Sequence, residues 1–205
     1  TATVIDATST TLTLLVPDGA RSGDVTVTIG AATTNAIHFT VLVPPPPIAV
    51  APLGVVAIRG SATGLDANGA VVFVAAGSSG LVVVDVSDPA HPALGANVGV
   101  GANAEDVRVV GRLAYVAAGT ALGVIDVSDP GAPKVLGVAA TTGEARDVAV
   151  AGGLAVVAEN ATGIELFDVS DPSTPRRIAT LATPGTAKGV DLTGSIAVVA
   201  DGAAG

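Results

Sequence analysis

Several residue types that carry chemistry are missing from this chain. It contains no cysteine, methionine or tryptophan, and aromatic residues make up only 2% of the sequence. The lack of cysteine excludes disulfide bonds, thiolate metal sites and cysteine nucleophiles. The few aromatic side chains give little support to carbohydrate binding by ring stacking.

Basic residues are also scarce. The chain has 9 Lys and Arg against 18 Asp and Glu, which gives a formal net charge of −9. Nucleic acids and anionic membranes bind basic surfaces, so both are disfavoured as partners. No apolar run approaches the roughly 18 residues that a membrane-spanning helix needs. We therefore expect no nucleic-acid partner and no membrane insertion of this segment.

The abundant residues favour an all-β fold. Apolar residues make up 49% of the chain and are mainly Val, Ala, Leu and Ile, which suit closely packed sheets. The 26 glycines and 13 prolines indicate frequent turns. Apolar residues spaced as in a helix, over ten or more positions, do not occur.

Four consecutive prolines, Pro44 to Pro47, divide the chain. Such a run favours a stiff polyproline II spacer, so we expect a linker over residues 44–48. Residues 1–43 contain short alternating patterns, the clearest from Asp24 to Ile29. With Leu-Thr-Leu before them and Ile-His-Phe-Thr-Val after them, they resemble the C-terminal half of a TIG/IPT immunoglobulin-like domain. We expect a partial sandwich whose open edges other sequence or another copy must cover.

Residues 49–205 repeat with a period near 42 residues. The phrase Asp-Val-Ser-Asp-Pro occurs three times, at 85–89, 126–130 and 168–172. Each copy reads as a first strand, a glycine turn, a second strand, a third strand that runs into the phrase, and a fourth strand after it. The glycine turns, such as Asn68-Gly69 and Gly152-Gly153, are those of tight two-residue hairpins. Four-stranded meanders with this period predict the blades of a β-propeller.

The third strand and its turn carry a family resemblance. Leu81 to Pro89 resembles the signature of LVIVD-repeat propellers, which occur in bacterial and archaeal extracellular proteins, and residues 121–126 and 163–168 are looser copies. The resemblance implies a propeller module that is secreted or displayed at the cell surface. Three full blades and the first two strands of a fourth are present, and residues 52–58 align with a fourth strand. Because propellers have about four to eight blades, we expect a truncated propeller within a longer protein.

The repeated Asp-Val-Ser-Asp-Pro loops hold paired carboxylates and a hydroxyl, which raises the question of a Ca²⁺ site. Calcium takes six to eight oxygen ligands, and each loop offers about three. Asp and Ser side chains also bond to nearby backbone amides in turns. Because the phrase recurs in every copy, we expect it to fix the turn. We expect no metal and no cofactor.

Residues that differ between copies are better candidates for a site, because the packing of the repeat does not fix them. Strand direction places two sets of loops at the same end of the ring. We expect a partner-binding rim there, formed by Glu105, Asp106, Glu144, Arg146, Asp147 and Glu159. A second polar set interrupts the innermost strands and is expected to line the axial channel: Asp66, Arg108 and Asp191.

These patterns predict a non-enzymatic structural or interaction module, with the propeller as a scaffold for a protein or cell-surface partner. No nucleophile–His–acid arrangement occurs, and the sole histidine of the repeats, His91, is in a loop at the opposite end of the ring from the variable loops, so hydrolytic triad chemistry has no support. Two alternatives remain. The chain could be a polymerising subunit of an extracellular fibre, completed by strand addition. It could also be an enzyme or a small-ligand binder that uses the axial channel.

Overall fold

The computed structural model describes residues 51–205 in full and, before them, the backbone of six short strands. The chain divides into two units, Thr1–Val50 and Ala51–Gly205. In the first unit the strands are β1 (Thr3–Ala7), β2 (Leu12–Leu15), β3 (Gly23–Val25), β4 (Thr28–Ile29), β5 (Ala32–Thr33) and β6 (Ile37–Phe39). They form the antiparallel pairs β1–β2, β3–β6 and β4–β5. The proline linker over residues 44–48 lies outside the described residues, and the immunoglobulin-like resemblance stays a prediction.

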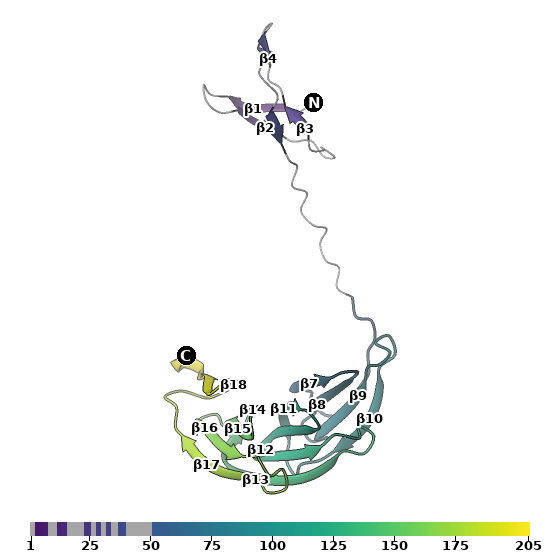
Figure 1. Ribbon diagram of the computed structural model, residues 1–205, viewed down its shortest axis with the longest axis vertical. Coiled ribbons are helices and arrows are strands. Elements are labelled where there is room, and N and C mark those ends of the chain that lie inside the picture. The colour runs from purple at the N-terminus through teal and green to yellow at the C-terminus, as the bar shows by residue number, and fades with distance from the viewer. Residues whose placement is uncertain are drawn as a thin grey trace. The chain divides into compact units, whose positions relative to one another are not determined.

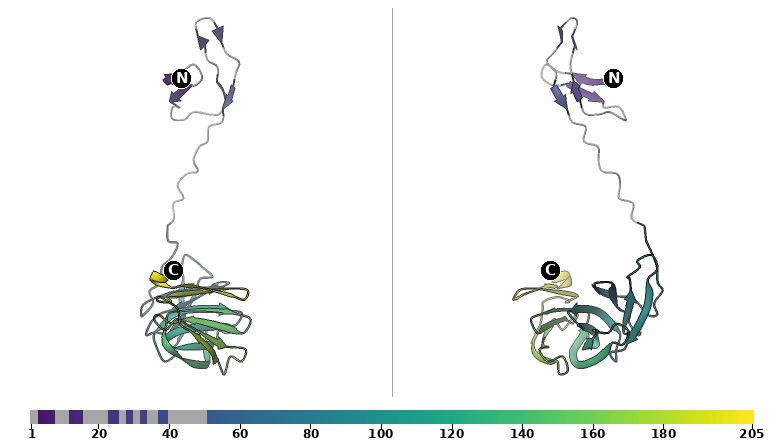
Figure 2. Two further views of the ribbon diagram at one scale, coloured as in Figure 1. Left: turned by 90° about the vertical axis from the view of Figure 1, so that its left-hand side faces the viewer. Right: turned by 45° about the vertical axis from the view of Figure 1, so that its right-hand side comes forward.

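The second unit is a series of antiparallel sheets arranged along an arc (Figures 1 and 2). Blade 1 contains β7 (Gly64–Asn68), β8 (Val71–Ala75), β9 (Leu81–Asp85) and β10 (Ala93–Val98), paired in that order. Blade 3 repeats the arrangement with β14 (Asp147–Ala151), β15 (Leu154–Ala158), β16 (Ile164–Asp168) and β17 (Arg176–Leu181). Blade 4 holds β18 (Gly189–Thr193) and β19 (Ile196–Ala200), followed by a short 3-10 helix over Gly202–Ala204. The predicted four-stranded β-propeller blades are confirmed.

Blade 2 reaches the same pattern with longer strands. It consists of β11 (Ala104–Val110), β12 (Leu113–Asp126) and β13 (Lys134–Ala145). The Val127 N–H donates to the Arg112 carbonyl over 2.8 Å, as the Val86 N–H does to Ala70 and the Val169 N–H to Gly153 in blades 1 and 3. The two ends of β12 therefore lie side by side, and β12 supplies both the second and the third strand of its blade.

Each blade is joined to the next by one repeated backbone bridge. Gly77 bridges Ala104, Gly119 pairs with Ala145, and Asn160 bridges Ala187. In each case the loop after a second strand reaches the start of the next blade's first strand. The first strands β7, β11, β14 and β18 are accordingly neighbours in that order.

The hydrophobic core consists of separate layers between adjacent blades. One layer packs Phe73 and Leu81 of blade 1 against Val107 and Val116 of blade 2. The layers between blades 2 and 3 and between blades 3 and 4 are built in the same way. On the other face of blade 1, Val56 and Ile58 cover a fourth apolar cluster. Residues 52–58 form no strand, but they pack where the sequence alignment expects a fourth strand.

The tight hairpins are confirmed, with one shift. Gly111-Arg112, Gly152-Gly153 and Gly194-Ser195 form the two-residue turns, and their glycines have positive φ. In blade 1 the pairing of Asn68 with Val71 moves the turn by one residue, to Gly69-Ala70. Among the described residues no helix is long and apolar enough to cross a membrane.

The loop after β15 contains a glycine whose replacement is expected to be costly. Gly163 has a φ of +97°, and a Cβ there would collide with the carbonyl oxygen of Leu181. We expect Gly163→Ala to lower the free energy of unfolding by about 2–3 kcal/mol in urea denaturation. Gly152→Ala is the matched control, because Gly152 also has positive φ but no atom lies within 4 Å of the added Cβ. It is expected to cost about 1 kcal/mol, and equal losses in both variants would contradict the collision.

Candidate functional site

The repeated Asp-Val-Ser-Asp-Pro loops are turns, as the sequence predicts. The first aspartate of each phrase accepts the N–H of the serine two residues later, from Ser87 to Asp85, Ser128 to Asp126 and Ser170 to Asp168, over 2.8–3.0 Å. The second aspartate accepts a further N–H in the same manner. These bonds to the serine lower the pKa of Asp85, Asp126 and Asp168. The carboxylates are therefore already engaged by the backbone of their own turns.

Residues that vary between blades meet in a shallow pocket of about 380 Å³. It lies where the loops between blades come together, because strand direction brings the start of each first strand and the end of each second strand to the same edge. The residues that line it are Thr63, Glu105, Arg146, Asn160 and Lys188. Two of them, Glu105 and Arg146, belong to the predicted rim.

Arg146 is the centre of an ion-pair network in this pocket. Its Nη1 lies 3.3 Å from the Glu105 carboxylate, and its Nη2 lies 2.8 Å from the Glu144 carboxylate. The Arg146 side chain is 37% exposed, so the guanidinium is held in place and still open to solvent. Exposed ion pairs of this kind contribute at most about 1 kcal/mol to stability. The network orients the arginine more than it stabilises the fold.

Asn160 occupies a backbone position that the other blades give to glycine. Its φ is +53°, and it alone among the described non-glycine residues has positive φ. Gly77, Gly119 and Gly202 stand at the equivalent positions with similar φ. Asparagine tolerates this conformation better than most residues, and here its side-chain amide donates to Glu144 over 2.9 Å. The asparagine thus adds a polar group to the pocket at a site where the other blades have no side chain.

Comparison with known protein families identifies the family of this chain. The family model of the LVIVD repeat matches three consecutive segments, residues 59–100, 101–141 and 142–183, which together make up more than half of the sequence. The chain belongs to the LVIVD repeat family. No curated protein matches it significantly.

Solved structures similar to this LVIVD propeller include two computationally designed proteins. Ika4 has a TM-score of 0.60 at 12% identity, over 74% of this chain and 92% of Ika4. Ika8 has a TM-score of 0.53 at 14% identity, over 69% of this chain and 43% of Ika8. At these identities the likeness concerns the fold alone.

Glu159 does not lie on the surface of the LVIVD propeller, which corrects its assignment to the rim. Its side chain is fully buried, because residues 141–143, near the end of β13, fold over it. Its Oε2 accepts the Gly143 N–H over 2.7 Å, while its Oε1 has no hydrogen-bond partner among the described residues. A partner at the rim cannot touch this residue.

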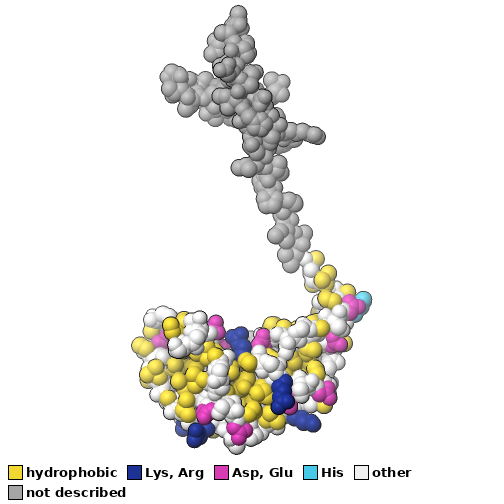
Figure 3. All heavy atoms as spheres, viewed as in Figure 1, with side chains coloured by type: hydrophobic (Ala, Val, Ile, Leu, Met, Phe, Trp, Pro, Cys, Tyr) yellow, Lys and Arg dark blue, Asp and Glu magenta, His cyan; other side chains and the backbone are white. Residues whose placement is uncertain are grey.

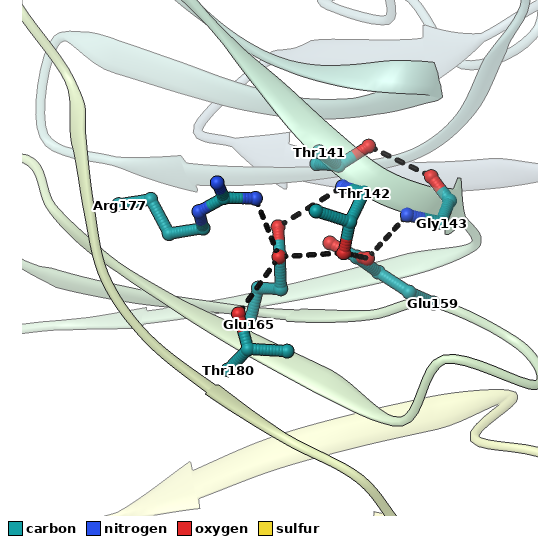
Figure 4. Close-up of polar contacts among 7 residues, drawn as sticks. All are labelled: Thr141, Thr142, Gly143, Glu159, Glu165, Arg177 and Thr180. Carbon is teal, nitrogen blue, oxygen red and sulfur yellow. Dashed lines mark hydrogen bonds and ion pairs between the residues drawn. The ribbon is translucent and has the colours of Figure 1, made fainter.

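Beside Glu159 lies a second buried carboxyl group, Glu165 (Figure 4). Glu165 accepts the Thr142 hydroxyl over 2.7 Å, the Thr180 hydroxyl over 2.9 Å and the Arg177 guanidinium over 2.8 Å. Although burial opposes its charged form, the hydrogen bonds around it keep the pKa of Glu165 below its ordinary value. Burial, and then the hydrogen bond with Glu165, raise the pKa of Glu159 to about 7. The pair therefore shares one proton near neutral pH, with Glu159 as the protonated member.

Asp106 and Asp147 form another carboxyl pair, on the adjacent first strands β11 and β14. Three causes raise the pKa of Asp106 to about 7: burial first, then the hydrogen bond with Asp147, and then the negative charge of Asp147. Each carboxylate also reaches the backbone of the next blade, at the N–H of Val148 and the N–H of Val190. Asp106 and Asp147, both predicted for the rim, thus link adjacent blades. Their carboxylates accept backbone N–H groups and do not face solvent freely.

The three channel residues are brought together only in part. Arg108 and Asp191 approach to 4.0 Å; the Asp191 side chain is largely exposed and that of Arg108 is 42% exposed. Asp66 instead accepts the Val109 N–H over 2.7 Å, which joins blade 1 to blade 2. Within residues 51–205, no group of three or more acidic or histidine residues is placed to hold a metal ion.

Thr63, Asn160 and Lys188 were not among the predicted site residues. The sequence held a signal for Asn160, because the other copies have glycine at its position. Thr63 and Lys188 stand in their own copies at the position of Glu105 and Arg146, so the same disagreement between copies pointed to them. Their place in the pocket follows from the bridges between blades, which join segments about 42 residues apart.

Proposed function

We propose that this chain is a non-enzymatic, secreted or cell-surface module whose propeller docks a protein partner at the Glu105–Arg146 pocket. One observation carries the proposal: one position of the repeat differs in every copy, and its four residues converge on one pocket, while the repeated residues build turns. These four are Thr63, Glu105, Arg146 and Lys188. Its chemistry suits a polar protein segment, since Arg146 is oriented by two carboxylates and remains exposed. Location outside the cell is supported by the family resemblance.

A phage-displayed library of random peptides, panned on the full chain, tests the docking site. We expect enriched peptides to lose at least tenfold in affinity for Arg146→Ala combined with Lys188→Ala. The matched control is Arg176→Ala, because Arg176 is an exposed arginine that also pairs with a carboxylate, that of Asp168, but lies in a different pocket. Enriched peptides that bind the double variant as well as the native chain would exclude the pocket.

A further inference from the structure

One stretch near the end of β13 lies between the buried glutamates and the pocket proposed for docking (Figure 4). On its buried side the Gly143 N–H donates to Glu159 over 2.7 Å. One residue further along both segments, the Asn160 side-chain amide donates to Glu144 over 2.9 Å. The Glu144 carboxylate also lies 2.8 Å from Nη2 of Arg146. The same stretch therefore contacts a buried carboxyl group on one side and two polar residues of the pocket on the other.

The buried side of this stretch depends on a proton. Glu159 and Glu165, the glutamate pair, are both fully buried, and the Thr142 hydroxyl lies 2.7 Å from Glu165 and 3.4 Å from Glu159. Within the described residues Glu159 Oε1 accepts no hydrogen bond, which fits a protonated acid that donates to Glu165. When the proton leaves, two carboxylates lie together away from solvent. Burial and mutual repulsion then both favour an arrangement that admits water.

Few charges are available to offset the second carboxylate. Arg177 on β17 bonds to Glu165 over 2.8 Å, but its side chain is 43% exposed. The scarcity of basic side chains is visible in Figure 3, where the few Lys and Arg on the face shown lie beside Asp and Glu. The charged groups on the neighbouring loops and strands belong to the pocket or to the second carboxyl pair: Glu105, Asp106, Glu144, Arg146, Asp147 and Lys188.

The proton is linked to the arrangement of residues 141–144. The pKa of Glu159 is about 7 while this stretch covers it, against an ordinary value of 4.5. An open arrangement, in which water reaches Glu159, brings its pKa back toward the ordinary value. Rising pH therefore favours the open arrangement by up to about tenfold for each pH unit between 4.5 and 7, and by no more above pH 7.

We propose that residues 141–144 form a latch that is closed while the glutamate pair holds a proton and opens when the pair loses it. In the closed latch Glu144 holds the Arg146 guanidinium and the Asn160 amide in the pocket. In the open latch both lose this support, so a partner that needs Arg146 binds more weakly. The effect on a partner rests on the proposed docking function, whereas the latch itself can be measured without a partner.

Two-dimensional ¹H–¹⁵N NMR of the full chain tests the latch without a partner. From about pH 5 to about pH 8 we expect the Gly143 amide signal and the Asn160 side-chain amide signals to titrate together, with a midpoint at or below about 7. The Ser128 amide is the internal control, because the Asp126 carboxylate that accepts it has a lowered pKa and stays ionised over this range. A titration at Gly143 without one at Asn160, or no titration at either, would overturn the latch.

Two variants assign the titration to the glutamate pair. Glu159→Gln should keep the latch closed, because glutamine resembles the protonated acid, so the Gly143 and Asn160 signals should stay constant with pH. Asp106→Asn is the matched control, because it removes the other carboxyl group whose pKa is raised to about 7 and should leave both titrations in place. Titration in Glu159→Gln as in the native chain, or its loss in Asp106→Asn, would overturn the proposal.

A peptide from the docking selection tests the effect on binding. It is selected at about pH 5.5, is N-terminally acetylated, contains no histidine and loses affinity for Arg146→Ala. For the native chain we expect its affinity to be at least about fivefold lower at about pH 8 than at about pH 5.5, which is the lower end of the usual coupling between sites. Glu159→Gln should show a smaller fall.

The outcomes separate the latch from the docking function. Equal affinity of such a peptide at both pH values, or an equal fall in Glu159→Gln, would overturn control of the pocket by the latch and leave docking in place. If no selected peptide depends on Arg146, the docking function fails, and the NMR titration still decides whether the latch exists.

Discussion

Replacing Phe167 by alanine is expected to lower the free energy of unfolding by about 3–5 kcal/mol, the range for a large aromatic side chain removed from a packed core. Phe167 lies on β16 and is fully buried in the layer between blades 2 and 3. It packs there with Leu122 and Val124 of blade 2 and with Val148 of its own blade. The cavity left by alanine lies between two sheets whose spacing the backbone bridges hold, so the layer cannot fully collapse around it.

The effect should depend on the lost volume and on burial. Phe167→Ile places in blade 3 the residue that blade 2 has at the equivalent position, Ile125, and is expected to cost less than about 1.5 kcal/mol. Ile178→Ala removes an apolar side chain that is 52% exposed and should change the free energy of unfolding by about 0.5 kcal/mol. Urea denaturation of the three variants gives the comparison. A loss below about 1 kcal/mol for Phe167→Ala would contradict a packed layer between blades 2 and 3.

The second large effect is a loss of stability as the pH rises from about 4.5 to about 7. The pKa of Glu159 is about 7 in the folded chain, against an ordinary value of 4.5. Between these values the folded chain binds a proton that the unfolded chain does not, so the free energy of unfolding falls with rising pH. At about 1.4 kcal/mol for each pKa unit, Glu159 contributes a loss on the order of 3 kcal/mol. Asp106, whose pKa is also raised to about 7, acts in the same direction.

The turn aspartates act in the opposite direction at lower pH. The pKa values of Asp85, Asp126 and Asp168 are lowered by hydrogen bonds from serine, so their contribution to stability is lost as the pH falls through those lowered values. The free energy of unfolding should therefore be largest at about pH 4 to 4.5, between the ordinary pKa of aspartate, 3.8, and that of glutamate, 4.5. Urea denaturation from about pH 3 to about pH 8 measures the profile.

Glu159→Gln isolates the buried pair from these other groups. Glutamine resembles the protonated acid, so the variant should lose part of the decline between pH 5 and 7 and be more stable than the native chain at pH 8. Glu144→Gln is the matched control, because Glu144 is half exposed and lies on β13 next to Gly143, whose N–H bonds to Glu159. If Glu159→Gln keeps the native pH profile, the buried pair does not share a proton.

Local features of the fold could be read from the sequence. The three Asp-Val-Ser-Asp-Pro turns and the glycine hairpins depend on residues within a few positions of one another, and the structure confirms both. The period near 42 then fixed the blade, since each copy has apolar faces that only a neighbouring copy can bury. The sequence pattern did not predict that β12 runs without a break through the second and the third strand of blade 2.

The acidic clusters could not be read in the same way. Glu159 follows a strand and looks like a surface loop residue, but residues 141–143 fold over it from a different part of the repeat. The only sequence signal was disagreement at a buried position, because blades 1 and 2 have Ala76 and Ala118 where Glu159 stands. Glu165 likewise replaces an apolar residue within the third strand. A charged residue at a position that other copies keep apolar is the pattern to look for in such repeats.

The layered core has a consequence for how this propeller unfolds. Each hydrophobic layer is shared by two adjacent blades, and the backbone bridges also join adjacent blades only. Stability is then a sum of nearest-neighbour terms, as in a one-dimensional chain of coupled units. One blade can therefore unfold locally while blades that do not touch it stay folded, so different spectroscopic probes should report different midpoints.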